Sequence, residues 1–61
     1  MTAEEAYDDC IAHAREGAKR QLKSANQTTD LMLAELLKSA ATTLGTFADL
    51  LQKIKAIRCP Q

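Results

Sequence analysis

Three side chains that could support covalent or metal chemistry lie close together near the start of the chain: Asp9, Cys10 and His13. On a helix, His13 would sit beside Cys10 and Asp9, which puts a thiol, a base and a carboxylate on one face. Acyl transfer also needs oxyanion donors and a pocket, and a single helix supplies neither. The pattern therefore favours a small core cysteine beside a histidine paired with Asp9. We expect no catalytic residues and no enzyme activity.

Metal and cofactor binding have equally weak support in the sequence. Cys10 and His13 could supply two zinc ligands per chain, completed by a second chain across a two-fold axis, but one Cys-x-x-His without a second pair is a weak signal. Glycine-rich loops, paired inward carboxylates and nucleotide motifs are missing. In a helical hairpin Cys10 and Cys59 would lie about 22 Å apart, beyond the roughly 7 Å that a disulfide spans. We expect no metal, no cofactor and no internal disulfide.

The composition indicates one small helical domain without a preference for charged partners. A chain of 61 residues builds only a marginal core, which disulfides, a metal or oligomerisation usually supplement. Eight Lys and Arg residues balance eight Asp and Glu residues, and Tyr7 and Phe47 are the only aromatic side chains on which a base could stack. The acidic start differs from a signal peptide, and the apolar runs are too short for a transmembrane span. We expect a cytoplasmic protein that does not bind membranes.

A first helix is expected from about residue 3 to residue 25. Thr2 followed by Glu5 resembles a capping box, in a segment whose acidic residues suit the start of a helix. A column that repeats every seven residues contains only small side chains: Ala3, Cys10, Gly17 and Ser24. Small residues along a contact line let two helix backbones approach closely. We therefore expect this column to face inward against a neighbouring helix.

A second helix is expected from about residue 30 to residue 58, with Pro60 closing the segment. Asn26 can adopt the left-handed conformation that ends the first helix, and Thr28 or Thr29 can cap the second. A connection this short predicts antiparallel neighbours, so the expected fold is an all-α, two-helix hairpin occupying residues 1–61 as a single domain.

A break at Gly45 would give a three-helix domain instead. Thr46 with Asp49 could cap a third helix there, in the segment with the weakest helix propensity. The apolar repeat nevertheless passes through Gly45 without losing phase. This continuity favours one long second helix, bent slightly at most.

The second predicted helix has an apolar surface wider than one neighbour can cover. Its heptad seam steps alternately by four and three residues: Leu33, Leu37, Ala40, Leu44, Phe47, Leu51 and Ile54. The two flanks add further apolar residues: Leu36, Leu50 and Ile57 on one side, and Ala34, Ala41 and Ala48 on the other. Two hairpins packed as a four-helix bundle would cover this surface, with a core and dimer interface made by Leu33, Leu37, Leu44, Phe47, Leu51 and Ile54. A different protein filling the same groove is the other solution.

The sequence favours a small non-enzymatic interaction protein, a protein-binding regulator or inhibitor that acts as a homodimer. A role as one subunit of a larger helical assembly is a variant of this function. The expected protein-binding residues combine the apolar flank with a cationic stripe on the first helix: Leu36, Leu50, Ile57, Arg15, Lys19 and Lys23. The alternative is a dimeric nucleic-acid-binding regulator that aligns two copies of this stripe. The stripe is also compatible with a solvated face, and the neutral net charge favours protein binding.

Overall fold

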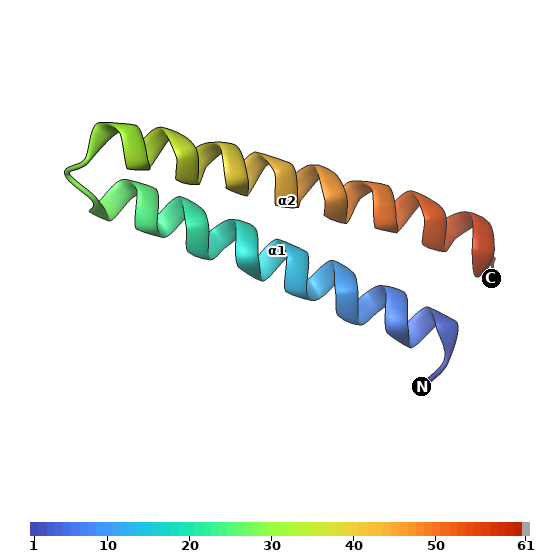
Figure 1. The fold of residues 1–61 in the computed structure, drawn as a ribbon. Helices are drawn as coiled ribbons and strands as arrows, with labels where there is room; N and C mark the ends of the chain where they lie inside the picture. Colours follow the sequence, from blue (N-terminus) through green and yellow to red (C-terminus); the bar gives the residue numbers. More distant parts are fainter. Residues whose placement is uncertain (61) are drawn as a thin grey trace.

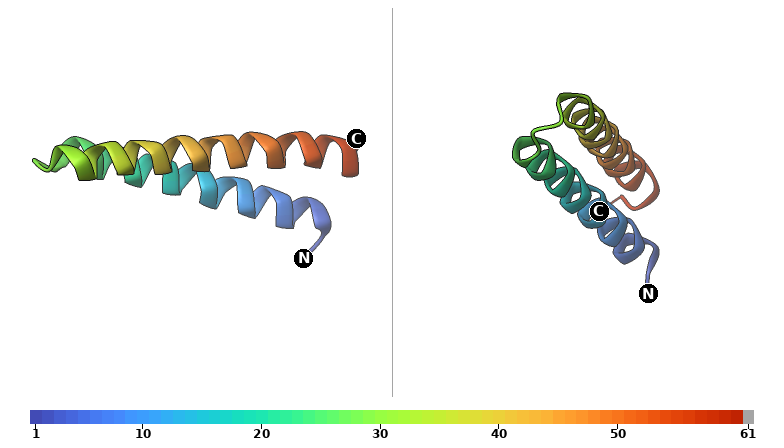
Figure 2. Two further views of the ribbon diagram at one scale, coloured as in Figure 1. Left: turned by 45° about the horizontal axis from the view of Figure 1, so that its top comes forward. Right: turned by 60° about the vertical axis from the view of Figure 1, so that its left-hand side comes forward.

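The computed structural model describes residues 1–60, which form two long helices packed side by side (Figure 1). Helix α1 spans Ala3–Gln27 and helix α2 spans Leu31–Arg58. The connection between them is short, so the helices run antiparallel and both chain termini lie at the same end (Figure 2). The predicted helical hairpin is confirmed. Within residues 1–60, neither helix has the combination of length and apolar character needed to cross a membrane.

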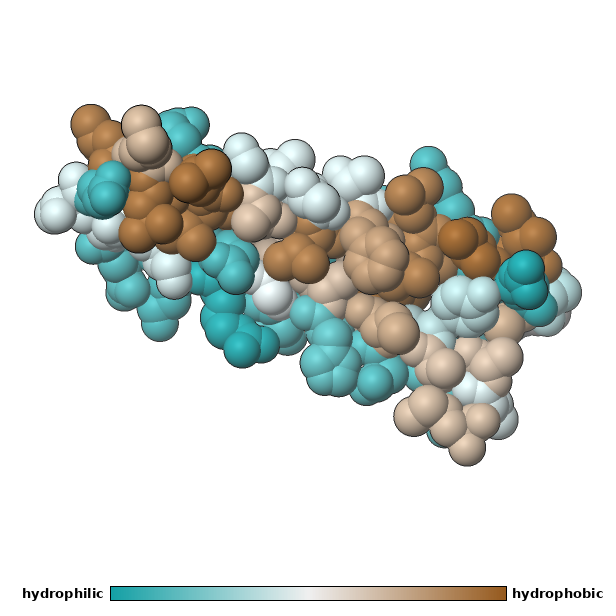
Figure 3. Space-filling model, in the orientation of Figure 1, coloured by the Kyte–Doolittle hydropathy of each residue, from teal (hydrophilic) through white to brown (hydrophobic). Residues whose placement is uncertain are grey.

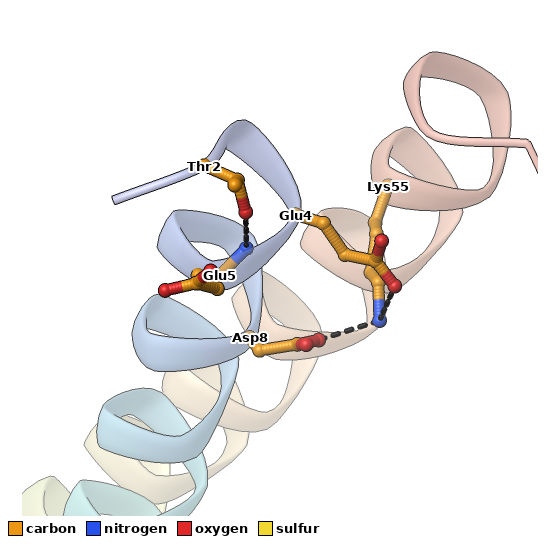
Figure 4. A network of polar contacts seen from close by, with 5 residues as sticks. All are labelled: Thr2, Glu4, Glu5, Asp8 and Lys55. Atoms are coloured by element: carbon orange, nitrogen blue, oxygen red, sulfur yellow. Dashed lines mark hydrogen bonds and ion pairs between the residues drawn. The ribbon is translucent and has the colours of Figure 1, made fainter.

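Thr2 caps the start of α1, as its sequence context predicted. Its hydroxyl oxygen accepts a hydrogen bond from the backbone N–H of Glu5 at 3.1 Å (Figure 4). At the other end the helix continues to Gln27, and the extended residue Thr28 follows it. The left-handed termination expected at Asn26 is wrong, because Asn26 is helical and no residue in the described range 1–60 has a positive φ.

Asp30 caps the start of α2, where Thr28 or Thr29 was expected to be the cap. One carboxylate oxygen of Asp30 accepts hydrogen bonds from the backbone N–H groups of Met32 and Leu33, both at 3.1 Å. The hydroxyl of Thr28 instead accepts the N–H of Asp30 at 3.2 Å and so shapes the turn. The expected cap was wrong because a carboxylate satisfies two donors here and its negative charge suits the positive end of the helix dipole.

Helix α2 runs through Gly45 without interruption, so the prediction of one continuous helix is confirmed. The threonines before Gly45 remain compatible with helix because their hydroxyls have partners inside it. Thr42 donates to the carbonyl oxygen of Lys38 at 3.1 Å, and Thr43 donates to that of Ser39 at 3.0 Å.

The two helices contact each other through residues spaced alternately three and four apart on each helix. The α1 positions are buried or half-buried: Glu4, Tyr7, Ile11, Ala14, Ala18, Gln21 and Ala25. The α2 positions are also buried or half-buried: Ala34, Leu37, Ala41, Leu44, Ala48, Leu51 and Lys55. Only one of the buried residues is larger than alanine: Ile11, Ala14, Ala25, Ala34 and Ala48. Because alanine buries little apolar area, the hairpin alone has a thin core.

The inward column expected on the first helix is wrong. Cys10 and its heptad equivalents Ala3 and Ser24 are exposed, and Gly17 is half-buried. The contact with α2 is centred about one residue further round the helix, on the line that includes Ile11, the largest buried side chain in the described residues. The larger side chain covers more apolar area than the small column does, which favours this rotation.

On α2, the contact with α1 is made by what the sequence suggested was only a flank, the alanine line (Ala34, Ala41 and Ala48). The expected seam is split. Four of its members are half-buried in the hairpin: Leu37, Ala40, Leu44 and Leu51. Three others remain exposed: Leu33, Phe47 and Ile54. Alanines permit a close approach of the backbones, so the leucines beside them still reach α1 while the far half of the seam faces away.

Candidate protein-interaction surface

An exposed apolar stripe runs the length of α2 beside its contact with α1. Its members recur at steps of three and four residues and therefore share one face: Leu33, Leu36, Ala40, Thr43, Phe47, Leu50, Ile54 and Ile57. All six large apolar members are exposed, by 39% at Ile54 and up to 78% at Ile57. Figure 3 shows apolar side chains gathered along α2, while hydrophilic ones cover much of α1. Apolar patches of this extent mark interaction sites in proteins.

The stripe has two edges that differ in their distance from α1. The near edge carries Leu33, Phe47 and Ile54, which are 43%, 50% and 39% exposed. The far edge carries the flank expected to bind protein, and its members are 63%, 51% and 78% exposed: Leu36, Leu50 and Ile57. The structure thus brings the exposed seam residues Leu33, Phe47 and Ile54 and the expected recognition flank together in one continuous surface.

Small residues of α1 border the stripe on the same side of the hairpin. A shallow hollow of about 420 Å³ is lined by Cys10, His13 and Ala14 from α1 and by Leu44 and Phe47 from α2. Cys10 belongs to the seven-residue column that was expected to face inward, here called the small-residue flank: Ala3, Cys10, Gly17 and Ser24. One face of the hairpin therefore combines a ridge of large side chains on α2 with a low flank on α1.

The three side chains that could support chemistry, Asp9, Cys10 and His13, are exposed on α1. His13 Nδ1 lies 2.9 Å from the carbonyl oxygen of Asp9 and 3.5 Å from its carboxylate, so their expected pairing is confirmed. Both side chains are more than half exposed. Cys10 is exposed and Cys59 is half-buried, and both are free thiols. Among residues 1–60, no group of three or more His, Cys, Asp and Glu side chains is placed to hold a metal ion.

The cationic stripe lies on the other flank of the hairpin, away from the apolar stripe. It consists of Arg15, Lys19 and Lys23. Arg15 Nη2 contacts a carboxylate oxygen of Asp49 at 3.2 Å, and Lys19 Nζ lies 3.7 Å from a carboxylate oxygen of Glu16. Asp49 follows Phe47 by two residues, or about 200° around the helix axis. The structure therefore separates the two halves of the recognition surface expected from the sequence.

Lys55 is a charged residue in the helix contact that the sequence reasoning missed. It continues the alanine line at the next heptad position, and its side chain is only 21% exposed. Its ammonium nitrogen lies 2.5 Å from a carboxylate oxygen of Asp8 and 3.9 Å from one of Glu4 (Figure 4). The hydrogen bond to Asp8 raises the pKa of Lys55 above its ordinary value of 10.5, against the opposing effect of desolvation.

This ion-pair cluster favours one alignment of the two helices. A charged residue at one position of a helix contact specifies the register, because only one alignment places it beside its counter-charges. Here the lysine meets the acidic first turns of α1 near the open end of the hairpin, where the helices lie farther apart than near the loop (Figures 1 and 2). The seven-residue repeat of the alanine line, ending in lysine, was the signal that could have revealed it.

The candidate site is thus a long, uncharged apolar face and not a pocket for a small molecule. The fully buried centres of protein–protein interfaces are likewise poor in charge and rich in large apolar side chains. Phe47 lies at the middle of this face, where anchor residues of interfaces concentrate. Comparisons of the chain with protein-family models, with curated proteins and with solved structures find no match.

Proposed function

We propose that this chain is a non-enzymatic protein-interaction module, a regulator or inhibitor that acts as a homodimer and binds a further protein. The observation that carries the proposal is the apolar stripe, whose six large apolar side chains are exposed along α2. Removing such a surface from water is the dominant favourable term in most protein associations. Amphipathic helices use residues at this spacing to bind protein grooves and other helices.

The far edge of the stripe is the part that we assign to the further protein. Leu36, Leu50 and Ile57 are on average more exposed than the near-edge residues, and they lie farther from α1. If a second hairpin covers the near edge, the far edge stays at the rim of that contact. A partner helix or groove could then use these side chains as apolar anchors.

The ion pairs of the cationic stripe weigh against nucleic acid as the partner. Arg15 is engaged by Asp49 and Lys19 by Glu16, so phosphate groups would have to compete with carboxylates already in place. Phosphate binding draws its affinity from the number of cations that release counterions. The chain also carries as many acidic as basic residues, which gives no long-range attraction for a polyanion.

The test is a capture experiment in extract from cells that contain this protein, read by mass spectrometry. Immobilised wild type is compared with Ile57→Asp and with the matched control Leu22→Asp. Leu22 is 48% exposed and borders the opposite groove with Lys19 and Lys38. We expect a protein that the wild type and Leu22→Asp retain and that Ile57→Asp loses, because a buried unpaired carboxylate is unfavourable at an apolar anchor.

A second pair of substitutions separates the protein-binding and nucleic-acid-binding functions. The double variant Arg15→Glu with Lys19→Glu should mainly slow association with the captured protein, because exposed charges act chiefly on the encounter rate. Nuclease treatment of the extract should leave the capture unchanged. If this double variant and nuclease each abolish retention while Ile57→Asp does not, the cationic stripe is the binding site and the proposed function is wrong.

A further inference from the structure

We infer that the near edge of the apolar stripe is covered by a second copy of this chain, packed face to face with the two α2 helices antiparallel. This inference rests on the proposed function and deepens it, because it names the surface, the orientation and the register of the homodimer. The large near-edge side chains and the small-residue flank together form the contact. The far edge then lies at the rim.

The first support is that both helices leave surface uncovered on the same side of the hairpin. In a four-helix bundle each helix has two neighbours, about a right angle apart around its axis, and so needs two adjoining apolar lines. Helix α2 has the alanine line against α1 and the stripe about one residue, or roughly 100°, further round. Helix α1 turns Cys10 to the same side as Phe47, since both border one hollow. The hairpin thus has the form of one half of a bundle.

The second support is the area that such a contact would bury. The hairpin is 46 Å long and 17 Å wide between Cα atoms, so its face covers roughly 800 Å², about the area that each partner contributes to a stable protein–protein interface. The apolar stripe contains no charged residue along its whole length. Two copies can therefore bring their apolar stripes together without burying like charges from α2.

The third support is a pattern of side-chain sizes that is complementary to itself. The near-edge line repeats every seven residues as Leu33, Ala40, Phe47 and Ile54. A two-fold axis midway between Ala40 and Phe47 lies close to the middle of α2, so the two helices overlap almost completely. It places the smallest side chain of the line opposite the largest, Ala40 against Phe47 of the second copy, and Leu33 against Ile54. Large against small is how well-packed helix layers interdigitate.

The same two-fold axis places α1 against α1 of the second copy. The contact there is made by the part of the small-residue flank that overlaps α1 of the second copy, whose members leave room for a close approach of two backbones: Cys10, Gly17 and Ser24. Within the hairpin only Gly17 of these positions lies close to α2, beside Leu44, whereas Cys10 and Ser24 are exposed there. Contact with a second backbone gives that flank a role.

The experiment measures the mass in solution by sedimentation equilibrium over a range of protein concentrations. We expect twice the chain mass of 6.7 kDa for the wild type and for Leu22→Asp, and the single chain mass for Phe47→Asp. Leu22 and Phe47 are matched in exposure, at 48% and 50%, but lie on opposite flanks. Circular dichroism shows whether each variant keeps its helices.

A size swap tests the antiparallel register without adding charge. Phe47→Ala and Ala40→Phe should each raise the dimer dissociation constant more than about tenfold, by leaving a cavity and by overpacking respectively. Together they should restore it to within about threefold of wild type, because the swap conserves volume across the two-fold axis. In one chain these residues lie two helical turns apart, about 10 Å, so this coupling must pass between chains. The control pair Ala40→Phe with Leu50→Ala should show no restoration.

Three results would overturn the inference. They are a folded wild-type monomer at concentrations up to several hundred micromolar, additive effects of Ala40→Phe and Phe47→Ala, and restoration by the Leu50 control pair instead. None of these results decides whether a further protein binds, which the capture experiment with Ile57→Asp tests separately.

Discussion

The two glycines of this chain give a matched test of how closely the helices pack. Both lie inside helices, Gly17 in α1 and Gly45 in α2. Apart from its chain neighbours and the backbone of its own helix, a Cβ atom added at Gly45 meets nothing within 4 Å, whereas one added at Gly17 comes 3.2 Å from Leu44 Cδ1. The same substitution therefore samples open space at one site and the contact between the helices at the other.

The expected magnitudes follow from helix propensity and from this contact. Gly45→Ala should raise the free energy of unfolding by about 0.8–1 kcal/mol, because alanine loses less backbone entropy in a helix than glycine does. In a domain of this size the melting temperature then rises by roughly 4–8 °C. Gly17→Ala has the same propensity gain, but Leu44 must move by a few tenths of an ångström to reach an ordinary carbon–carbon separation of about 3.5–4 Å. We therefore expect Gly17→Ala to raise the free energy of unfolding by less than about half as much as Gly45→Ala does.

Thermal unfolding followed by circular dichroism measures both variants, at one fixed protein concentration because self-association makes the melting temperature concentration-dependent. Leucine extends the comparison: Gly17→Leu should lower stability by about 1–3 kcal/mol through overpacking, while Gly45→Leu should raise it. If Gly17→Ala stabilises as much as Gly45→Ala and Gly17→Leu stabilises too, the described contact between Gly17 and Leu44 is wrong.

Further predictions concern the caps and the charged contact. Asp30→Ala should lower the free energy of unfolding by about 1 kcal/mol in urea titrations, since two backbone N–H groups lose their acceptor, whereas Thr29→Ala should be nearly neutral. Asp8→Asn should bring the pKa of Lys55 back toward 10.5 in an NMR titration, because the hydrogen bond to Asp8 is the main cause of its increase. Because that pKa is raised on folding, the stabilisation by Lys55 is fully present below pH 10.5 and is lost as the pH rises through the folded-state pKa. As the pH rises above 10.5, the free energy of unfolding should therefore fall more in the wild type than in Lys55→Met.

Much of the fold could be predicted because helix signals are local. Thr2 and the acidic residues after it marked the start of the first helix, and the uninterrupted apolar phase through Gly45 favoured one second helix. The turn was harder, because Thr28, Thr29 and Asp30 are all good capping residues. Which of them caps depends on the geometry of a few dihedral angles in the turn, and sequence pattern does not resolve these.

The contact face could not be predicted because α2 is apolar over two adjoining lines. Periodicity locates an apolar arc, but it does not say which part of a wide arc faces a given neighbour. Weighting large side chains put Phe47 in the expected core and dimer interface of a bundle; within the hairpin, the structure buries Ala48 and leaves Phe47 half exposed. The pairings of Lys55 with Asp8 and of Arg15 with Asp49 are long-range and follow only once that rotation is known.

The most direct test of an interface on the striped face uses the two native thiols. Cys10 is exposed on that face, while Cys59 lies beside Lys55 and Pro60 at the end of α2. We expect the rate at which a thiol reagent modifies Cys10 to fall as the protein concentration rises, because a second chain covers it, while the rate at Cys59 stays nearly constant. Variants with Cys10→Ser or Cys59→Ser assign the two rates. A Cys10 rate that stays constant over the whole concentration range in folded protein would contradict the account.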